Sequence, residues 1–270
     1  MKAAMKNRSL ARTILIAVAT WCGAAASSHS ALAADARPDL AGRGRVVSDF
    51  RQEVGQAHIV SFGLFGGQSV FESEARGAAS VLRRWLGTDV QPVVRFNGKR
   101  RASASAQTLH SALLKAGRAM DPESDVLVVV LTSHGSPEGL AVVAGRREDI
   151  LSPMGFRDML NASGAKYRAV IISACYSGVF VPALADERTL VITAAAPDRP
   201  SFGCQDGATW TYFGDAFFNR ALRTSPTVEA AFETARRLVT AREQREGFEP
   251  SSPQMAGGSE VLARLNQRLR

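Results

Sequence analysis

The sequence predicts an α/β protein: a three-layer α-β-α domain built on a mostly parallel sheet of about six strands. Apolar runs alternate along the chain with amphipathic segments of helical spacing, which is the pattern of a parallel sheet covered on both faces. Two of the runs, 126–131 and 169–172, are continuously apolar, as expected of strands buried on both faces. A chain of 270 residues, 46% of them hydrophobic, is sufficient for one complete core.

The hydrophobic pattern places each element in turn. The expected strands are 57–62, 90–96, 126–131, a short strand at 140–143, 169–173 and 190–193. The expected helices are 70–86, a helix around 109–116, 153–163, 209–223, 226–243 and a short helix at the end of the chain. Ser105 is a suitable cap for the second helix, and Ser225-Pro226 for the helix at 226–243.

Residues 1–33 have the three parts of a secretory signal peptide. Four basic residues precede an apolar stretch at 13–26, and Ala31-Leu32-Ala33 forms an A-x-A cleavage site. The apolar stretch is short for a bilayer span, although an uncleaved anchor and lipidation at Cys22 are alternatives. We therefore expect an exported protein, periplasmic or secreted, with no stable membrane insertion after cleavage.

The rest of the chain divides into three parts. Residues 34–55 are a flexible polar arm, 56–245 the main folded domain, and 246–270 a Gly/Pro/Ser-rich loop with a short helix. The formal charge of +8 includes four basic residues of the signal segment. Their removal leaves 29 basic against 25 acidic residues, a mild excess of +4 spread along the chain. No nucleic-acid partner is expected from this distribution.

Two predicted strands end beside reactive side chains. The run 126–131 leads into Thr132-Ser133-His134-Gly135, and 169–172 into Ser173-Ala174-Cys175. Because the carboxyl ends of parallel strands meet at one edge of the sheet, His134 and Cys175 are expected to meet there. Histidine suits the role of general base near neutral pH, and cysteine that of nucleophile. Zinc binding is a weaker alternative, because no further paired ligands accompany the two residues.

Acyl transfer to a thiol also requires backbone donors for the oxyanion. The N–H groups of Gly135 and Cys175 are the expected donors. Ser177-Gly178 is expected to begin a helix whose dipole favours a thiolate. The glycine-rich segment 63–67 is not expected to bind phosphate, because it lacks the Lys-Ser/Thr of a phosphate loop. Residues 121–125 are expected to form a turn before a strand.

After signal removal the chain keeps two cysteines, Cys175 and Cys204. In an exported protein, this count alone favours a disulfide between them. The alternative is one working thiol and one buried thiol.

The segments around the two strand ends resemble the catalytic blocks of the legumain family of cysteine peptidases. A third block, Thr193-Ala194-Ala195-Ala196-Pro197-Asp198-Arg199-Pro200-Ser201-Phe202-Gly203-Cys204, is similar to that family's stretch of alanines, proline, serine, aromatic residue and cysteine. Thr211-Tyr212-Phe213-Gly214-Asp215 resembles its aromatic-Gly-Asp element. The resemblance covers about 57–240 and implies a caspase-like (hemoglobinase-like) fold for 56–245.

The resemblance also implies roles for individual residues. His134 becomes the base and Cys175 the nucleophile, with oxyanion donors at Gly135 and Cys175. Ser201 and Asp215 match positions of the primary specificity pocket. Cys204 matches a family position, which argues against a bridge to Cys175.

Departures from the family motifs concern substrate recognition. Ser173 stands where legumains place a glutamate that helps to recognise asparagine, and the segment 67–72 lacks their Asn-x-Arg-His. Gln68 or Ser69 is then expected to orient the histidine. Asparagine specificity is not expected to carry over, and Asp215 in the pocket would favour a basic or amide-bearing side chain.

The expected function is that of a cysteine endopeptidase acting on polypeptides through an acyl-enzyme, with no cofactor and no metal. Transpeptidase or ligase chemistry through the same acyl-enzyme is the enzymatic alternative. A caspase-like binding module with a relict dyad is the alternative without catalysis. The sequence does not indicate an oligomeric state.

Overall fold

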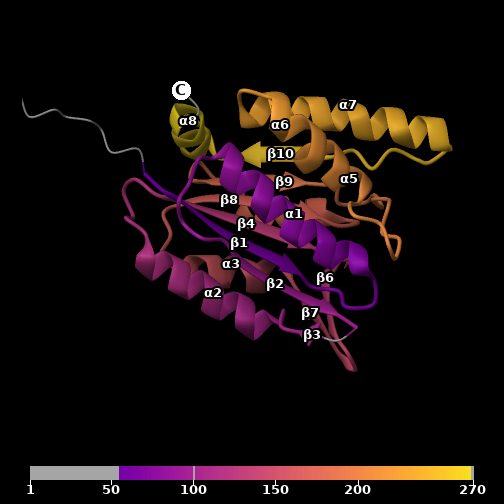
Figure 1. Ribbon diagram of the computed structural model, residues 1–270, viewed down its shortest axis with the longest axis horizontal. Helices are drawn as coiled ribbons and strands as arrows, with labels where there is room; N and C mark the ends of the chain where they lie inside the picture. Colours follow the sequence, from indigo (N-terminus) through magenta and orange to yellow (C-terminus); the bar gives the residue numbers. More distant parts are fainter. Residues whose placement is uncertain (1–54, 100, 269–270) are drawn as a thin grey trace, which may run out of the picture. The chain divides into compact units, whose positions relative to one another are not determined.

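The computed structural model describes residues 55–99 and 101–268 (Figure 1). The signal segment, Cys22 and nearly all of the polar arm lie outside the described residues. The strands are β1 Ala57–Gly63, β2 Val93–Gly98, β3 Arg101–Ala102, β4 Val126–Thr132, β5 Gly135–Ser136, β6 Gly139–Ala144, β7 Arg147–Leu151, β8 Tyr167–Ser173, β9 Thr189–Thr193 and β10 Gln254–Gly257.

The helical segments agree closely with the predicted ones. They are α1 Ser69–Trp85, α2 Ala106–Ala119, α3 Pro153–Ala162, a 3₁₀ segment Ser177–Phe180, α4 Val181–Leu184, α5 Tyr212–Gly214, a π-helical segment Asp215–Ala221, α6 Leu222–Thr224, α7 Val228–Glu246 and α8 Ser259–Arg268. Ser105 caps α2 as expected, by accepting a hydrogen bond from the Thr108 N–H. The cap of α7 is Thr227 rather than Ser225-Pro226, because its hydroxyl accepts from the Ala230 N–H.

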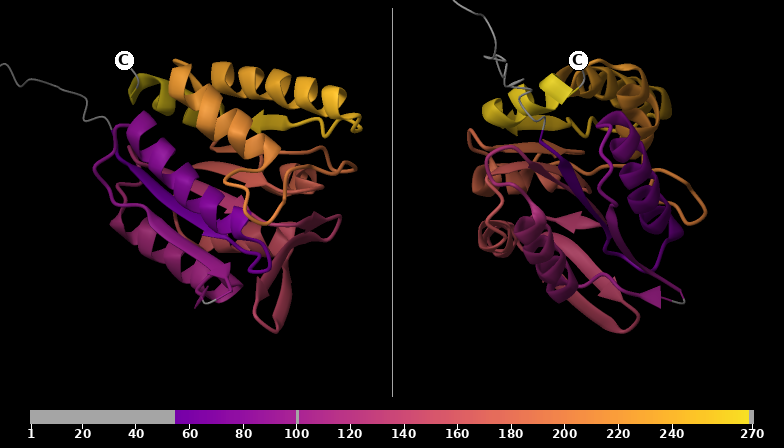
Figure 2. Two further views of the ribbon diagram at one scale, coloured as in Figure 1. Left: turned by 45° about the vertical axis from the view of Figure 1, so that its right-hand side comes forward. Right: turned by 60° about the vertical axis from the view of Figure 1, so that its left-hand side comes forward.

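The predicted three-layer architecture is confirmed. The main sheet has seven strands in the order β10-β9-β8-β4-β1-β2-β3, and its central five are parallel. One apolar core lies between the sheet and α1, the π-helical segment, α7 and α8; a second lies between the sheet and α2, α3 and the segment around α4. Figures 1 and 2 show α2 and α3 on the side of the sheet opposite α1 and α7.

Four strands were not predicted: β7, β10 and the two-residue strands β3 and β5. The loop expected at 246–258 contains β10, which pairs antiparallel with β9 at the edge of the sheet. β7 pairs with β6 in a separate three-strand sheet, and this hairpin projects from the body of the domain (Figure 2). β10 and α8 lie beyond the predicted boundary at residue 245, yet Val261 and Leu265 of α8 are part of the first core.

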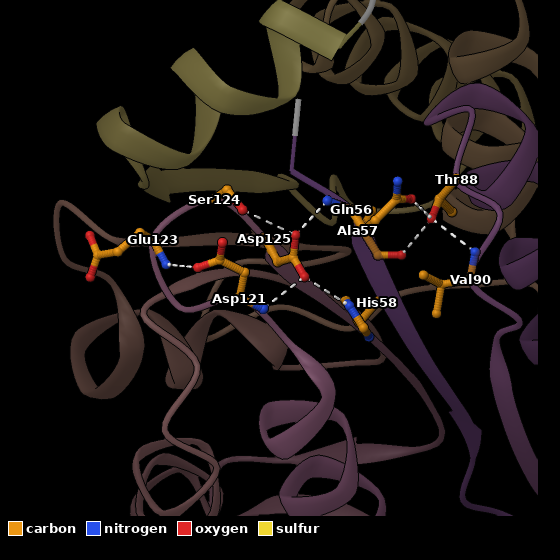
Figure 3. A network of polar contacts seen from close by, with 9 residues as sticks. All are labelled: Gln56, Ala57, His58, Thr88, Val90, Asp121, Glu123, Ser124 and Asp125. Carbon is orange, nitrogen blue, oxygen red and sulfur yellow. Dashed lines mark hydrogen bonds and ion pairs between the residues drawn. The ribbon is translucent and has the colours of Figure 1, made fainter. Parts of the chain in front are cut away.

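A buried carboxylate holds the amino ends of β1 and β4. Asp125 accepts hydrogen bonds from the N–H groups of Gln56 (2.5 Å) and Asp121 (3.0 Å) and from the Ser124 hydroxyl (3.4 Å), and it contacts His58 Nε2 at 3.1 Å (Figure 3). We call Gln56, His58, Asp121 and Asp125 the amino-end cluster. The expected turn at 121–125 is therefore confirmed, and its aspartates serve the backbone around them.

No helix within the described residues combines the length and apolar character that a membrane crossing requires.

Candidate active site

The register of the central strands aligns the two reactive segments. Thr132, the last residue of β4, lies opposite Ser173, the last residue of β8. His134 and Cys175 each follow two residues later, so both leave the sheet at the same edge. The turns are in contact: a Cβ added to Gly135 would lie 2.0 Å from the Cys175 carbonyl oxygen, so only glycine fits there. The structure therefore brings the predicted base and nucleophile segments together.

Gln68 holds the His134 ring. Its Oε1 lies 2.5 Å from His134 Nε2. Because an amide oxygen only accepts, Nε2 carries a proton and the lone pair of the neutral ring lies on Nδ1. Phe65 and Phe71 pack edge-on against the ring, at centroid distances of 4.6 and 5.0 Å. Burial lowers the pKa of His134 below its ordinary value of 6.5, which favours the neutral ring that a general base requires.

The second candidate for orienting the histidine, Ser69, has another task. Its N–H and hydroxyl both donate to Asp206 Oδ1, at 2.9 and 2.8 Å, and its hydroxyl accepts from the Gly207 N–H. Hydrogen bonds from Ser69, followed by the nearby Lys99, lower the pKa of Asp206 to about 2. These contacts fasten the loop around 203–207 to the start of α1, next to Gln68.

The Cys175 thiol lies against the main chain of Ser201. Its Sγ accepts from the Ser201 N–H and donates to the Ser201 carbonyl oxygen, both at 3.2 Å. Tyr176 follows with a φ of +54°, a left-handed conformation that is unusual for a tyrosine, and its N–H donates to Arg199 O at 2.8 Å. The Cys175 sulfur is therefore held between the N–H and the carbonyl oxygen of a single residue, Ser201.

The expected oxyanion donors stay predictions, but the Cys175 N–H is available for the role. Within the described part of the chain, no hydrogen bond uses this N–H. The expected helix after Cys175 is only a four-residue 3₁₀ turn followed by the four-residue α4. The dipole of so short a segment is correspondingly small, and the backbone donor that reaches the sulfur is the Ser201 N–H.

The three expected pocket residues have contacts of their own in the structure, and their role in substrate recognition stays a prediction. Ser173 is buried, and its hydroxyl lies 3.1 Å from Thr211 Oγ1. Ser201 meets the thiol through its main chain. Asp215 accepts from Asn219 Nδ2 and pairs with Arg220 Nε, both at 2.8 Å, so its charge is compensated within its own helix. The expected preference for a basic or amide-bearing side chain stays a prediction.

The sequence interpretation missed a buried acid beneath the site. Glu74 of α1 is fully buried and accepts hydrogen bonds from Thr132 and Thr211. Burial raises its pKa above the ordinary value, and interactions with Ser173, Thr211 and Thr132 partly oppose the shift. A signal was present, because Glu74 interrupts the apolar stripe that Phe71, Ala75 and Ala78 form on α1.

Cys175 and Cys204 are both free thiols. Burial raises the pKa of Cys204 to about 12, and the proximity of Cys175 and Glu74 adds to the shift. Cys204 therefore stays protonated and unreactive near neutral pH. Among the described residues, no three His, Cys, Asp or Glu side chains gather as metal ligands would.

Comparisons with known proteins agree with this architecture. A search of solved structures found caspase-1 from Spodoptera frugiperda, with a TM-score of 0.50 and 15% sequence identity over 76% of this chain and 86% of that chain. At this identity, the likeness shows the fold alone, a caspase-like one. The search of curated proteins found no match. The model of the peptidase C13 family, which is the legumain family, matches residues 80–261, which include His134 and Cys175. The chain belongs to the peptidase C13 family of cysteine peptidases.

Proposed function

We propose that this protein is a cysteine endopeptidase in which His134 and Cys175 form the catalytic dyad. The observation that carries the proposal is the Gln68–His134 contact at 2.5 Å, because it leaves Nδ1 as the basic nitrogen of a ring beside the Cys175 turn. A relict dyad has no need of an oriented, neutral histidine. The proposal therefore favours catalysis over the alternative of a binding module.

The proposed reaction proceeds in two halves. His134 Nδ1 takes the thiol proton while Cys175 Sγ forms a bond to the carbonyl carbon of the substrate, and the carbonyl becomes an oxyanion. The N–H groups of Cys175 and Gly135 donate to this oxyanion. The imidazolium then protonates the leaving amine as the C–N bond breaks, which leaves a thioester. Water, deprotonated by His134, attacks the thioester and releases the acid and the thiol.

A peptide-based thiol-reactive inhibitor, such as an acyloxymethyl ketone library, tests this proposal. We expect labelling of Cys175 and no labelling of Cys204, mapped by mass spectrometry, with cleavage of a peptide library lost by roughly 10⁴-fold or more in C175A. C204S serves as the matched thiol control and should keep both the labelling of Cys175 and the cleavage of the peptide library. Cleavage that survives in C175A would contradict the proposal.

The same acyl-enzyme also allows transfer to an amine in place of water. Adding a peptide with a free amino group to the cleavage assay separates the two outcomes, since a transpeptidase forms a ligated product and a hydrolase forms only the acid. We propose hydrolysis as the main reaction with polypeptides as the substrate class.

We also propose that the protein is exported, on the evidence of the signal segment at 1–33. Fractionation and amino-terminal sequencing of the native protein test this. An exported, cleaved protein should begin at Ala34, whereas a protein that keeps Met1 in the membrane fraction would indicate the uncleaved anchor.

A further inference from the structure

Glu74 is linked to the residues that precede both members of the proposed dyad, directly to Thr132 and through Thr211 to Ser173. Its Oε1 accepts from the hydroxyl of Thr132, two residues before His134, at 2.8 Å. Its Oε2 accepts from the N–H and the hydroxyl of Thr211, each at 2.8 Å. We call Glu74, Thr132, Ser173 and Thr211 the carboxyl-end cluster.

Ser173 completes the cluster on the side of the nucleophile. The hydrogen of the Thr211 hydroxyl is directed to Glu74, so the 3.1 Å contact between Ser173 and Thr211 has the Ser173 hydroxyl as donor. Ser173 is the last residue of β8, two residues before Cys175. The Glu74 carboxylate thereby links the end of β4 directly and the end of β8 through Thr211.

Thr211 also connects the cluster to the loop that meets the thiol. It is the cap of α5, with its hydroxyl accepting from the Gly214 N–H at 2.9 Å, and it follows the loop whose Ser201 contacts Cys175. Gly214 is packed against Glu74, because an added Cβ would lie 1.9 Å from its Oε2. α1, which carries Glu74, also provides Gln68 at its start. The base, the nucleophile and the loop of Ser201 are therefore all tied to the same buried side chain.

We propose that Glu74 is a positioning residue, which acts through Thr132, Thr211 and Ser173 to hold the His134 and Cys175 turns in reactive register. The inference rests on the proposed function of this dyad. Hydroxyl and N–H donors converge on both carboxylate oxygens in a fully buried site, and such a satisfied group defines one geometry for the segments around it. Misplacement of reacting groups by about 1 Å can cost 10²-fold in rate, which is how a residue that never touches substrate affects catalysis.

E74A and E74Q test this role, with D125A of the amino-end cluster as the matched control. Asp125 is also a buried carboxylate that ties strand ends together, but at the opposite edge. We expect E74A to lower kcat by roughly 10²-fold with little change in KM. E74Q should keep most of the wild-type kcat, because its amide provides an acceptor for Thr211 and a donor for Thr132. D125A should lower the Tm and leave kcat of the folded protein unchanged.

The rate of alkylation of Cys175 by iodoacetamide across pH provides a readout that needs no substrate. A thiol assisted by His134 reacts at lower pH than a free cysteine, whose pKa is about 8.5. E74A should move the profile towards that of a free thiol, and D125A should not. A wild-type profile of an ordinary thiol would contradict the dyad itself. A displaced wild-type profile that E74A leaves unchanged would overturn only the role of Glu74.

T132V covers the case in which E74A does not fold. The change is nearly isosteric and removes only the hydroxyl that donates to Oε1. We expect a loss of about tenfold in kcat, with a circular dichroism spectrum like that of the wild type. A folded T132V with wild-type kcat and an unchanged alkylation profile would overturn the proposal, as would a loss of kcat in D125A equal to that in E74A.

Discussion

A buried carboxylate accepts hydrogen bonds at the amino ends of the parallel strands, and another does so at their carboxyl ends. The two carboxylates bind different kinds of groups. At the amino ends, Asp125 gathers backbone N–H groups and His58 (Figure 3). At the carboxyl ends, Glu74 gathers the hydroxyl of Thr132 and two donors of Thr211. Asp125 binds groups where the strands begin, whereas Glu74 binds Thr132, two residues before His134, and Thr211, which contacts Ser173, two residues before Cys175. The comparison sets Asp125, whose contacts hold the starts of the strands, against Glu74, whose contacts we propose position the site.

The two histidines give the largest contrast between the edges. Each contacts one side-chain oxygen: His134 that of Gln68, and His58 that of Asp125. We expect H134A to lower kcat/KM by roughly 10³-fold, because it removes the general base. H58A should cost stability and leave kcat/KM of the folded protein near the wild-type value. Steady-state kinetics with unfolding curves for both variants would check this, and equal losses of activity would undermine the functional difference between the edges.

Gln68 provides the next contrast, because it acts only at the carboxyl edge. Q68A should lower kcat by roughly 10²-fold, since the ring loses the contact that orients it.

In the wild-type enzyme, burial lowers the pKa of His134, so the acid limb of kcat/KM should lie below pH 6.5. The neutral ring acts as the base, so activity should fall as pH falls through that lowered pKa. A limb above pH 6.5 would contradict this assignment.

Two glycines allow the packing of the edges to be compared directly. An added Cβ would lie 1.9 Å from Glu74 Oε2 at Gly214, and 1.9 Å from the Ser124 carbonyl oxygen at Gly55. Both G214A and G55A should therefore destabilise the protein, by about 1–3 kcal/mol. Only G214A should also lower kcat, by about tenfold, because it displaces the carboxylate of the carboxyl-end cluster. Urea unfolding and kinetics of the same samples would separate the two effects.

The smallest expected effect concerns the outer contact of the carboxyl edge. D206N weakens the attachment of the loop around 203–207 to Ser69, so we expect a loss of only a few-fold in kcat/KM, because this contact is exposed. Hydrogen bonding lowers the folded-state pKa of Asp206 from 3.8 to about 2. Its contribution to stability is then present above pH 3.8 and lost as pH falls towards 2. Acid unfolding of D206N and the wild type should converge over that interval.

The sequence predicts the parallel core and the meeting of the His134 and Cys175 segments well, because both depend on local signals. A strand buried on both faces is a continuous apolar run, and parallel strands end at one edge, so His134 and Cys175 follow directly. Gln68 was one of two candidates to orient the histidine, and the start of α1 decides between them. A shift of one residue along a helix turns a side chain by about 100°, so the choice needed the exact helix start.

Other features lack a local signal. β10 is an edge strand that joins the sheet by backbone pairing with β9, so no alternation of side chains marks it within a Gly/Ser/Pro-rich segment. β7 is mostly charged and exposed in its hairpin, which conceals its strand character. The compensation of Asp215 by Arg220 depends on the π-helical segment, which the expected regular helix at 209–223 did not anticipate.

By itself, the sequence determined the fold class and indicated His134 and Cys175 as the candidate base and nucleophile, because buried periodicity and strand-end residues are encoded within short windows. The tertiary structure alone decided that Glu74 contacts Thr132, 58 positions away in the chain, and Thr211, 137 positions away. It also decided that the main chain of Ser201 contacts the thiol. The family match begins at residue 80, after Gln68 and Glu74. Contacts between distant segments depend on the register and packing of the whole domain, and no short stretch of sequence specifies them.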